Sequence, residues 1–170
     1  MSEGLTLRFT RISPTHHRFE YRRPDGSGEA VAMEARNLLF HDLLHYAVES
    51  EAGLRGSFYG ILGRIGGYEE LAVAGGAALG GEIAITERVV GGLAEALQDP
   101  GLEAEAFVAH ATDYLDIYEE RAPRWFTPPF ITAVRERMRQ LLGRWKATPF
   151  GETMELTFPP PEMRRARRPV

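Results

Sequence analysis

The stretch FHDLLHYAVESE, residues 40–51, combines the apolar spacing of a helix with a concentration of polar side chains. His41 and His45 lie four positions apart, Asp42 follows the first histidine, and Glu49 lies four positions after the second. Successive residues of a helix are turned by about 100°, so these four side chains form one polar stripe. Because the stripe borders the apolar face of the same helix, we expect both histidines to be at least partly shielded from water.

The residues on either side of this stretch have periodicities of their own. Alternation of apolar and polar residues predicts strands at residues 5–12, 17–23, 29–36 and 153–158. Three- and four-residue spacing of apolar residues predicts helices at residues 37–51, 57–65, 82–98, 102–120 and 128–145. Residues 68–81 predict a turn of helix and then a glycine-rich loop, which matches neither glycine motif of phosphate-binding proteins.

This order of elements predicts an α+β fold. We expect a three-stranded N-terminal antiparallel meander plus a C-terminal strand, packed against a bundle of four to five helices. Residues 1–158 are expected to form a single domain, because 170 residues is the size of one ordinary domain. The tail rich in proline and arginine, residues 159–170, is expected to be disordered.

Composition narrows the classes of function. Hydrophobic residues make up 44% and charged residues 26% of the chain, as in globular proteins. No apolar run approaches the roughly 20 residues needed to cross a bilayer, so we expect a cytoplasmic protein with no membrane partner. The absence of cysteine excludes disulfides and thiolate metal sites. A net charge of −4 gives no overall attraction to nucleic acid, which is therefore not an expected partner.

Histidines four positions apart on a helix can direct two imidazole nitrogens at one point, which predicts a divalent metal site. In a chain without cysteine, the remaining ligands must be carboxylates. Glu82 is a strong candidate because it falls near the centre of the apolar face of its own helix, where an unpartnered carboxylate is costly. The expected ligands of a zinc, manganese or iron ion are His41, His45, Glu49 and Glu82. Further candidates are Glu87, His110 and Asp113.

Two other interpretations of these residues remain open. The histidines can be structural, each bonded to a main-chain carbonyl or paired with a carboxylate such as Glu49. They can also form an acid–base pair without a metal. Glu82 has a structural alternative too, an ion pair with Arg88 or Arg135 across the bundle.

HDLLH, residues 41–45, resembles the HExxH helix of zinc metallopeptidases, with Asp42 in place of the glutamate. This resemblance implies that the two histidines bind zinc, that Asp42 is the catalytic base that activates water, and that Glu82 completes the ligands. Because aspartate is one methylene shorter than glutamate, it also implies a shifted position for that water.

Three further resemblances involve the same helix. HDxxH is similar to the motif of the metal-binding ubiquinone-biosynthesis scaffold family, in which a glutamate follows the second histidine by twelve positions; here that position is Ser57. His41-Asp42 resembles the paired motif of the HD-domain phosphohydrolases, which are all-helical. FHDLLHYAVESEAGL, residues 40–54, resembles a small group of uncharacterised bacterial proteins, which implies a bacterial protein but brings no activity with it.

Two functions are therefore expected. One is metal-dependent hydrolysis of an unknown small-molecule substrate at the HDLLH helix. The other is a non-enzymatic homodimeric interaction module with structural histidines. The stretch WFTPPF, residues 125–130, favours the second function unless its aromatic side chains cover the core of their own domain.

Overall fold

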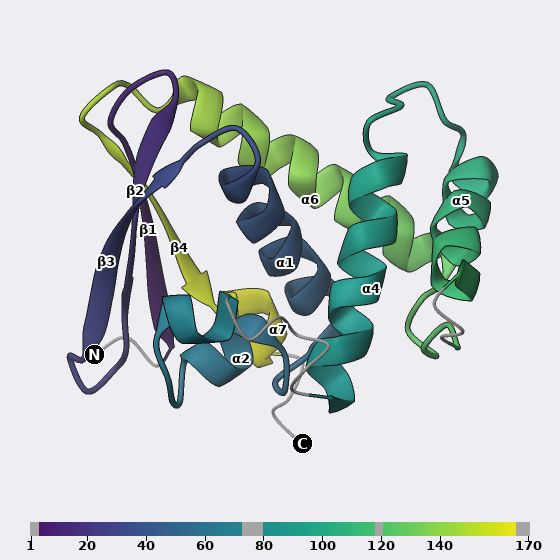
Figure 1. Ribbon diagram of the computed structural model, residues 1–170, viewed down its shortest axis with the longest axis horizontal. Coiled ribbons are helices and arrows are strands. Elements are labelled where there is room, and N and C mark those ends of the chain that lie inside the picture. Colours follow the sequence, from purple (N-terminus) through teal and green to yellow (C-terminus); the bar gives the residue numbers. More distant parts are fainter. Residues whose placement is uncertain (1–3, 73–79, 118–120, 166–170) are drawn as a thin grey trace.

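The computed structural model describes residues 4–72, 80–117 and 121–165 (Figure 1). The strands are β1 Leu5–Arg11, β2 His16–Arg22, β3 Gly28–Glu34 and β4 Thr153–Phe158. The helices are α1 Leu38–Ala52, α2 Phe58–Leu62, α4 Gly81–Ala96, α5 Ala104–Ile117, α6 Pro128–Ala147 and α7 Pro161–Arg165. The predicted α+β class is confirmed. Residues 68–72 are helical, and the predicted glycine-rich loop extends through residues 73–79, outside the described residues.

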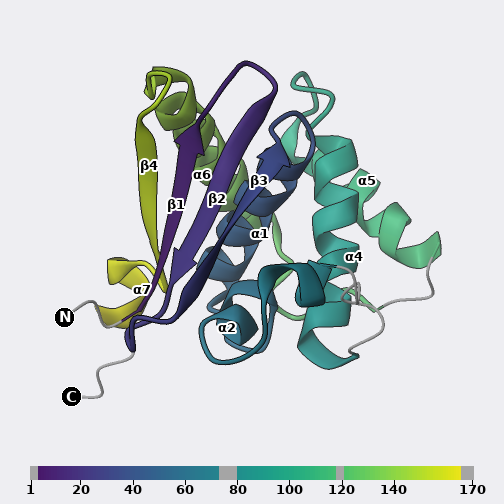
Figure 2. The same cartoon turned by 60° about the vertical axis from the view of Figure 1, so that its left-hand side comes forward.

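The four strands form one antiparallel sheet in the order β3-β2-β1-β4. The C-terminal strand joins the meander at β1, where Phe9 is opposite Met154 and Leu7 is opposite Leu156. These four side chains are buried, and the helices cover their face of the sheet (Figure 2). The alternation seen in the sequence therefore separates a face packed against helices from an open, polar face.

Helix α1 lies in the middle of the molecule, between the sheet and α4 (Figure 1). It contacts α2, α4, α6 and β3, and every residue from 42 to 50 is buried. This part of the helix offers no solvated face, although Leu38 and His41 before it are exposed. Its polar side chains must therefore find partners inside the protein, which fixes the position of the candidate site.

Local signals set the ends of the longer helices. Helix α1 is followed by Gly53, whose φ of 68° is the left-handed conformation that favours glycine. Helix α6 begins after Thr127, whose Oγ1 accepts a hydrogen bond from the Phe130 N–H, and two prolines occupy its first positions.

Trp125 and Phe126 pack against the core of their own domain. Both contact Phe130, and the ring centroids of Trp125 and Phe130 are 5.1 Å apart. The feature that favoured a homodimer thus has an intramolecular explanation, and the homodimer stays a prediction.

The chain after β4 differs from the sequence-based expectation. Residues 161–165, predicted to be part of a disordered tail, form α7. Met163 is buried, and Glu162 forms an ion pair of 2.9 Å with Arg137 of α6. These contacts hold the segment against the bundle, so the prediction of disorder is wrong for this segment; residues 166–170 lie outside the described residues.

His17 is a buried polar group of the interface between sheet and helices. Its side chain is buried beside Phe9 and Trp145, and neither ring nitrogen has a hydrogen-bond partner within the described chain. Burial lowers the pKa of His17 below 6.5, although the Asp42 carboxylate opposes this change. The neutral ring is therefore the form that the folded protein tolerates.

We expect the substitution His17→Leu to raise the free energy of unfolding by about 1–3 kcal/mol at pH 8, because it removes an unsatisfied buried polar group. The unfolded chain binds a proton on His17 more readily than the folded chain, so the wild type loses stability as pH falls below 6.5. The gain should therefore be larger at pH 5 than at pH 8 in urea denaturation.

The control for this prediction is His16→Leu, since His16 is the exposed neighbour on the opposite face of the sheet. It should change the free energy of unfolding little at either pH. An equal gain from His17→Leu at both pH values would contradict the lowered pKa.

Candidate metal centre

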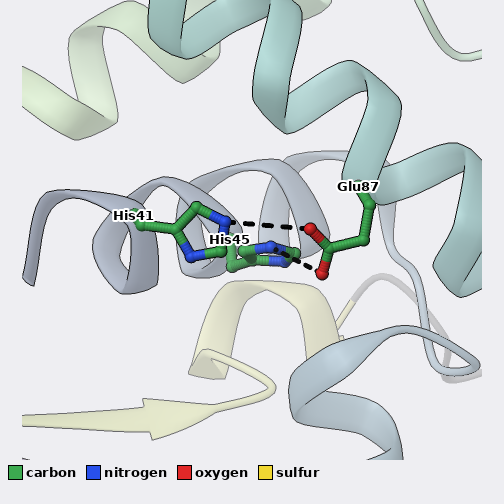
Figure 3. A group of neighbouring side chains, drawn as sticks. All are labelled: His41, His45 and Glu87. Carbon is green, nitrogen blue, oxygen red and sulfur yellow. Dashed lines mark ion pairs between the residues drawn. The ribbon is translucent and has the colours of Figure 1, made fainter. Parts of the chain in front are cut away.

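Helices α1 and α4 bring two histidines and one glutamate together (Figure 3). Nε2 of His45 lies 3.2 Å from Oε1 of Glu87, and Nε2 of His41 lies 3.7 Å from Oε2 of the same carboxylate. One ligand atom from each of the three residues lies within 4.8 Å of the others. We call His41, His45 and Glu87 the His–His–Glu cluster.

The cluster runs from the interior to the surface. The side chain of His45 is 1% exposed, that of Glu87 is 24% exposed and that of His41 is 48% exposed. Water and small molecules therefore reach the cluster from the side of His41 and Glu87.

Glu49 fixes the orientation of the His45 ring. Its Oε1 lies 3.2 Å from Nδ1 of His45, and its Oε2 accepts a hydrogen bond of 2.9 Å from the Tyr59 N–H. When Glu49 is ionised, its carboxylate only accepts hydrogen bonds, and Nδ1 of His45 then donates to it. Nε2 is then directed at Glu87, as in histidines whose second nitrogen binds a metal.

Asp42 lies on the Nδ1 side of the His41 ring. Its Oδ1 is 3.9 Å from Nδ1 of His41, and both carboxylate oxygens accept hydrogen bonds from the Tyr68 hydroxyl, at 3.1 and 3.0 Å. The Tyr59 hydroxyl donates to the main-chain oxygen of Asp42 at 2.9 Å. Each histidine therefore has a buried carboxylate on its Nδ1 side and Glu87 on its Nε2 side.

The pKa values show which charges the cluster favours. Burial alone would lower the pKa of His45, but the carboxylates of Glu49 and Glu87 raise it to about 10. Desolvation would raise the pKa of Glu87, yet the two histidines hold it well below its usual range. Complete burial raises the pKa of Glu49. This raised pKa opposes ionisation of Glu49, whereas the shifts of His45 and Glu87 favour a positive charge on the ring beside an ionised Glu87.

The spacing of the cluster fits a small divalent cation. Zinc ligands at about 2.0–2.1 Å from the ion are separated by about 3.3 Å in a tetrahedron. The two histidines lie 3.2 and 3.7 Å from different oxygens of Glu87, and one ligand atom from each residue lies within 4.8 Å of the others. Nε2 of His45 is buried, and its described polar neighbour is the Glu87 carboxylate, with which it forms an ion pair and no hydrogen bond. A cation between the two would bond to both.

Glu82 was expected among the ligands, and the structure places it elsewhere. It stands in the exposed first turn of α4, where its carboxylate accepts hydrogen bonds from the N–H groups of Arg55 and Gly56. Ile83 is buried, but Glu82 beside it is exposed and turns towards the segment before α2. Glu82 therefore holds the segment before α2 and does not reach the histidines.

Glu49 and Asp42 also take roles that differ from the expected ones. Glu49, expected as a ligand, contacts the far side of the His45 ring, and Asp42, expected as the catalytic base, has both oxygens directed at Tyr68. Each lies on the Nδ1 side of a histidine, Glu49 beside His45 and Asp42 beside His41. His110, a further candidate from the sequence, lies on α5 and pairs with Glu95 at 3.4 Å.

Glu87 was one of the further candidates, and it is the carboxylate of α4 that faces both histidines. The structure explains its position, since α4 packs against α5 on one side and α1 on another. Ile83 and Val90 are buried one turn before and after Glu87. The sequence did contain a signal for Glu87: this acidic residue lies four positions after one apolar residue and three positions before another, on the same face of the helix.

Comparison with known proteins adds no relative: no family model, curated protein or solved structure matches the chain. Within the described ranges, no helix combines the length and the apolar character needed to span a bilayer. The argument for function therefore depends on the site itself.

In the metal-free protein we expect the His45 ring to titrate at about 10 when its nitrogens are followed by NMR. The imidazolium then stabilises the fold fully below pH 6.5, and this contribution is lost as pH rises through about 10. Glu87→Gln should lower the pKa of His45, because one of its two carboxylates is removed.

Glu95→Gln, on the exposed side of α4, is the matched control and should leave the His45 titration unchanged. A His45 ring that titrates near 6.5 in the wild type would contradict the prediction, because the two carboxylates would then not outweigh the desolvation of the ring.

Proposed function

We propose that the chain binds a divalent metal ion through His41, His45 and Glu87 and is a metal-dependent hydrolase. The observation that carries the proposal is the buried Nε2 of His45, which faces Glu87 but makes no hydrogen bond with a described residue. Glu49 holds the same ring by Nδ1, the arrangement that prepares a histidine for a metal.

The ligand set favours zinc, manganese or iron. Two imidazoles and one carboxylate are the protein ligands of many catalytic zinc sites and of non-haem iron sites, both of which keep coordination positions open. The partial exposure of His41 and Glu87 gives those positions access to water. A closed structural site would use four protein ligands.

A bound ion of this kind polarises a carbonyl or phosphoryl oxygen and lowers the pKa of its water towards neutrality. The residues of the chain supply its orientation. Glu49 keeps the proton of His45 on Nδ1, and Asp42 lies on the corresponding side of His41. Tyr68 holds Asp42 in place through both carboxylate oxygens.

The alternative without a metal is an imidazolium at His45 between Glu49 and Glu87. A buried ion pair adds little net stability, because the desolvation of its charges offsets their attraction. Such an ion pair needs one histidine only, namely His45. The convergence of a second histidine, His41, on the same carboxylate supports the metal ion.

The first test is a metal titration of protein that has been freed of metal with a chelator and carries no histidine tag. Zn²⁺, Mn²⁺ and anaerobic Fe²⁺ are titrated separately by calorimetry, and we expect one of them to bind at one ion per chain. Because each removes a ligand, Glu87→Gln and His45→Gln should weaken that binding at least about tenfold.

The matched control is Glu82→Gln, which changes a carboxylate of the same helix that does not face the histidines. It should bind the ion as the wild type does. Absence of saturable binding to the folded wild type, checked by circular dichroism, would overturn the proposal, as would an equal loss in Glu82→Gln.

The affinity for the ion should rise with pH. His45 must lose a proton from Nε2 before it binds a metal, and its pKa in the metal-free protein is about 10. Each proton released on binding gives up to about a tenfold gain in affinity per pH unit. We expect this slope between pH 6 and pH 9, together with proton release measured in a weakly buffered titration; a flat profile would contradict displacement of a proton from His45.

A further inference from the structure

A groove opens beside the His–His–Glu cluster, between the N-terminal end of α1 and the C-terminal end of α4. Its volume is about 760 Å³, within the range of about 300–1,000 Å³ that is usual for small-molecule sites. The residues that line it are Arg36, Asn37, Leu38, Phe40, His41, Ala94, Leu97 and Gln98. His41 belongs to both the groove and the cluster, so a molecule in the groove would lie against the exposed ligand of the metal.

The groove has an apolar floor. Leu38, Phe40 and Leu97 line it, and Leu38 is 43% exposed although it is large and apolar. Phe40 and Leu97 also line a second hollow of about 520 Å³, which continues towards Met138 of α6. The apolar surface therefore extends away from the cluster and suits a chain of several carbon atoms.

The polar part of the groove favours an anion. Arg36 lines it, and the first turn of α1 contains no acidic residue, while Asn37 makes no side-chain capping bond there. The Glu34 carboxylate accepts from the N–H of Asn37 at 3.4 Å and so lies near the positive end of the helix dipole, which leaves Arg36 as the group that would attract an anion. The Glu34 carboxylate accepts from the N–H of Arg36 at 3.2 Å but does not line the groove.

We propose that this groove binds the substrate, and that the substrate is an amphipathic carboxylate. Its apolar chain lies over Leu38, Phe40 and Leu97, and its carboxylate lies beside Arg36. This assignment rests on the proposed function, because the metal ion at His41 is what makes the groove a substrate site.

The experiment uses octanoate as the probe and metal-free full-length protein, so that the carboxylate cannot bind through a metal. Binding is followed by NMR shifts of the main-chain amides, and 1-octanol serves as the uncharged probe of equal length. We expect saturable shifts at residues 36–41 and 94–98, with octanoate bound more tightly than octanol.

Substitutions at two exposed positions distinguish the contribution of charge to binding from that of apolar contact. Arg36→Gln should weaken octanoate about two- to fivefold, as expected for an exposed charge pair, and leave octanol unchanged. Leu38→Ser should weaken both probes about fivefold through lost apolar burial. Arg18→Gln, on the open face of the sheet, is the matched control and should change neither.

Metal titration of the same variants distinguishes the two proposals. Unchanged metal binding with no octanoate shift in the groove overturns the substrate assignment and leaves the metal centre standing. If octanol binds as tightly as octanoate, the proposal that the substrate carries a carboxylate is overturned. Octanoate binding in the groove of a wild type that takes up no metal overturns the metal-dependent hydrolase and leaves an anion-binding groove.

Discussion

Burial of α1 on every side is the constraint on which the rest of the structure depends. The sheet, α2, α4 and α6 surround residues 42–50 of this helix, so the polar side chains of that part cannot turn to water, whereas His41 before it is exposed. Asp42 finds the Tyr68 hydroxyl, His45 finds Glu49, and Glu49 also takes the N–H of Tyr59. These bonds tie the central helix to the segments that follow it, and they place two histidines at a fixed orientation towards α4.

Local patterns in the sequence were enough to predict the architecture. Period-two alternation identified all four strands, and the inward residues of β4 match those of β1 in register, as Leu7 and Leu156 illustrate. The end of the chain was harder, because Pro161–Arg165 has the composition of a loose tail. It is ordered by two contacts, the burial of Met163 and the pairing of Glu162 with Arg137, that no local pattern contains.

The candidate site was predictable on one helix and not between helices. His41 and His45 share a face whatever the fold is, because their spacing is a property of the helix. The choice between Glu82 and Glu87 depends on which side of α4 meets α1. A helical wheel with one apolar face places Glu82 near the centre of that face. In the structure α4 packs against two neighbouring helices, so its buried surface is wider and includes Glu87. The roles of Asp42 and Glu49 also depended on partners, Tyr68 and Tyr59, that are distant in sequence.

His17 and His45 are buried to a similar extent and respond to burial in opposite ways. His17 has aromatic neighbours and no hydrogen-bond partner among the described residues, so desolvation dominates and its pKa falls. His45 has a carboxylate on each side, and their fields outweigh the desolvation of its ring. A proton or a divalent cation satisfies this geometry in the same way, by placing positive charge between Glu49 and Glu87. The two therefore compete for one position, and the field that holds the proton in the metal-free protein is also the field that would attract the ion.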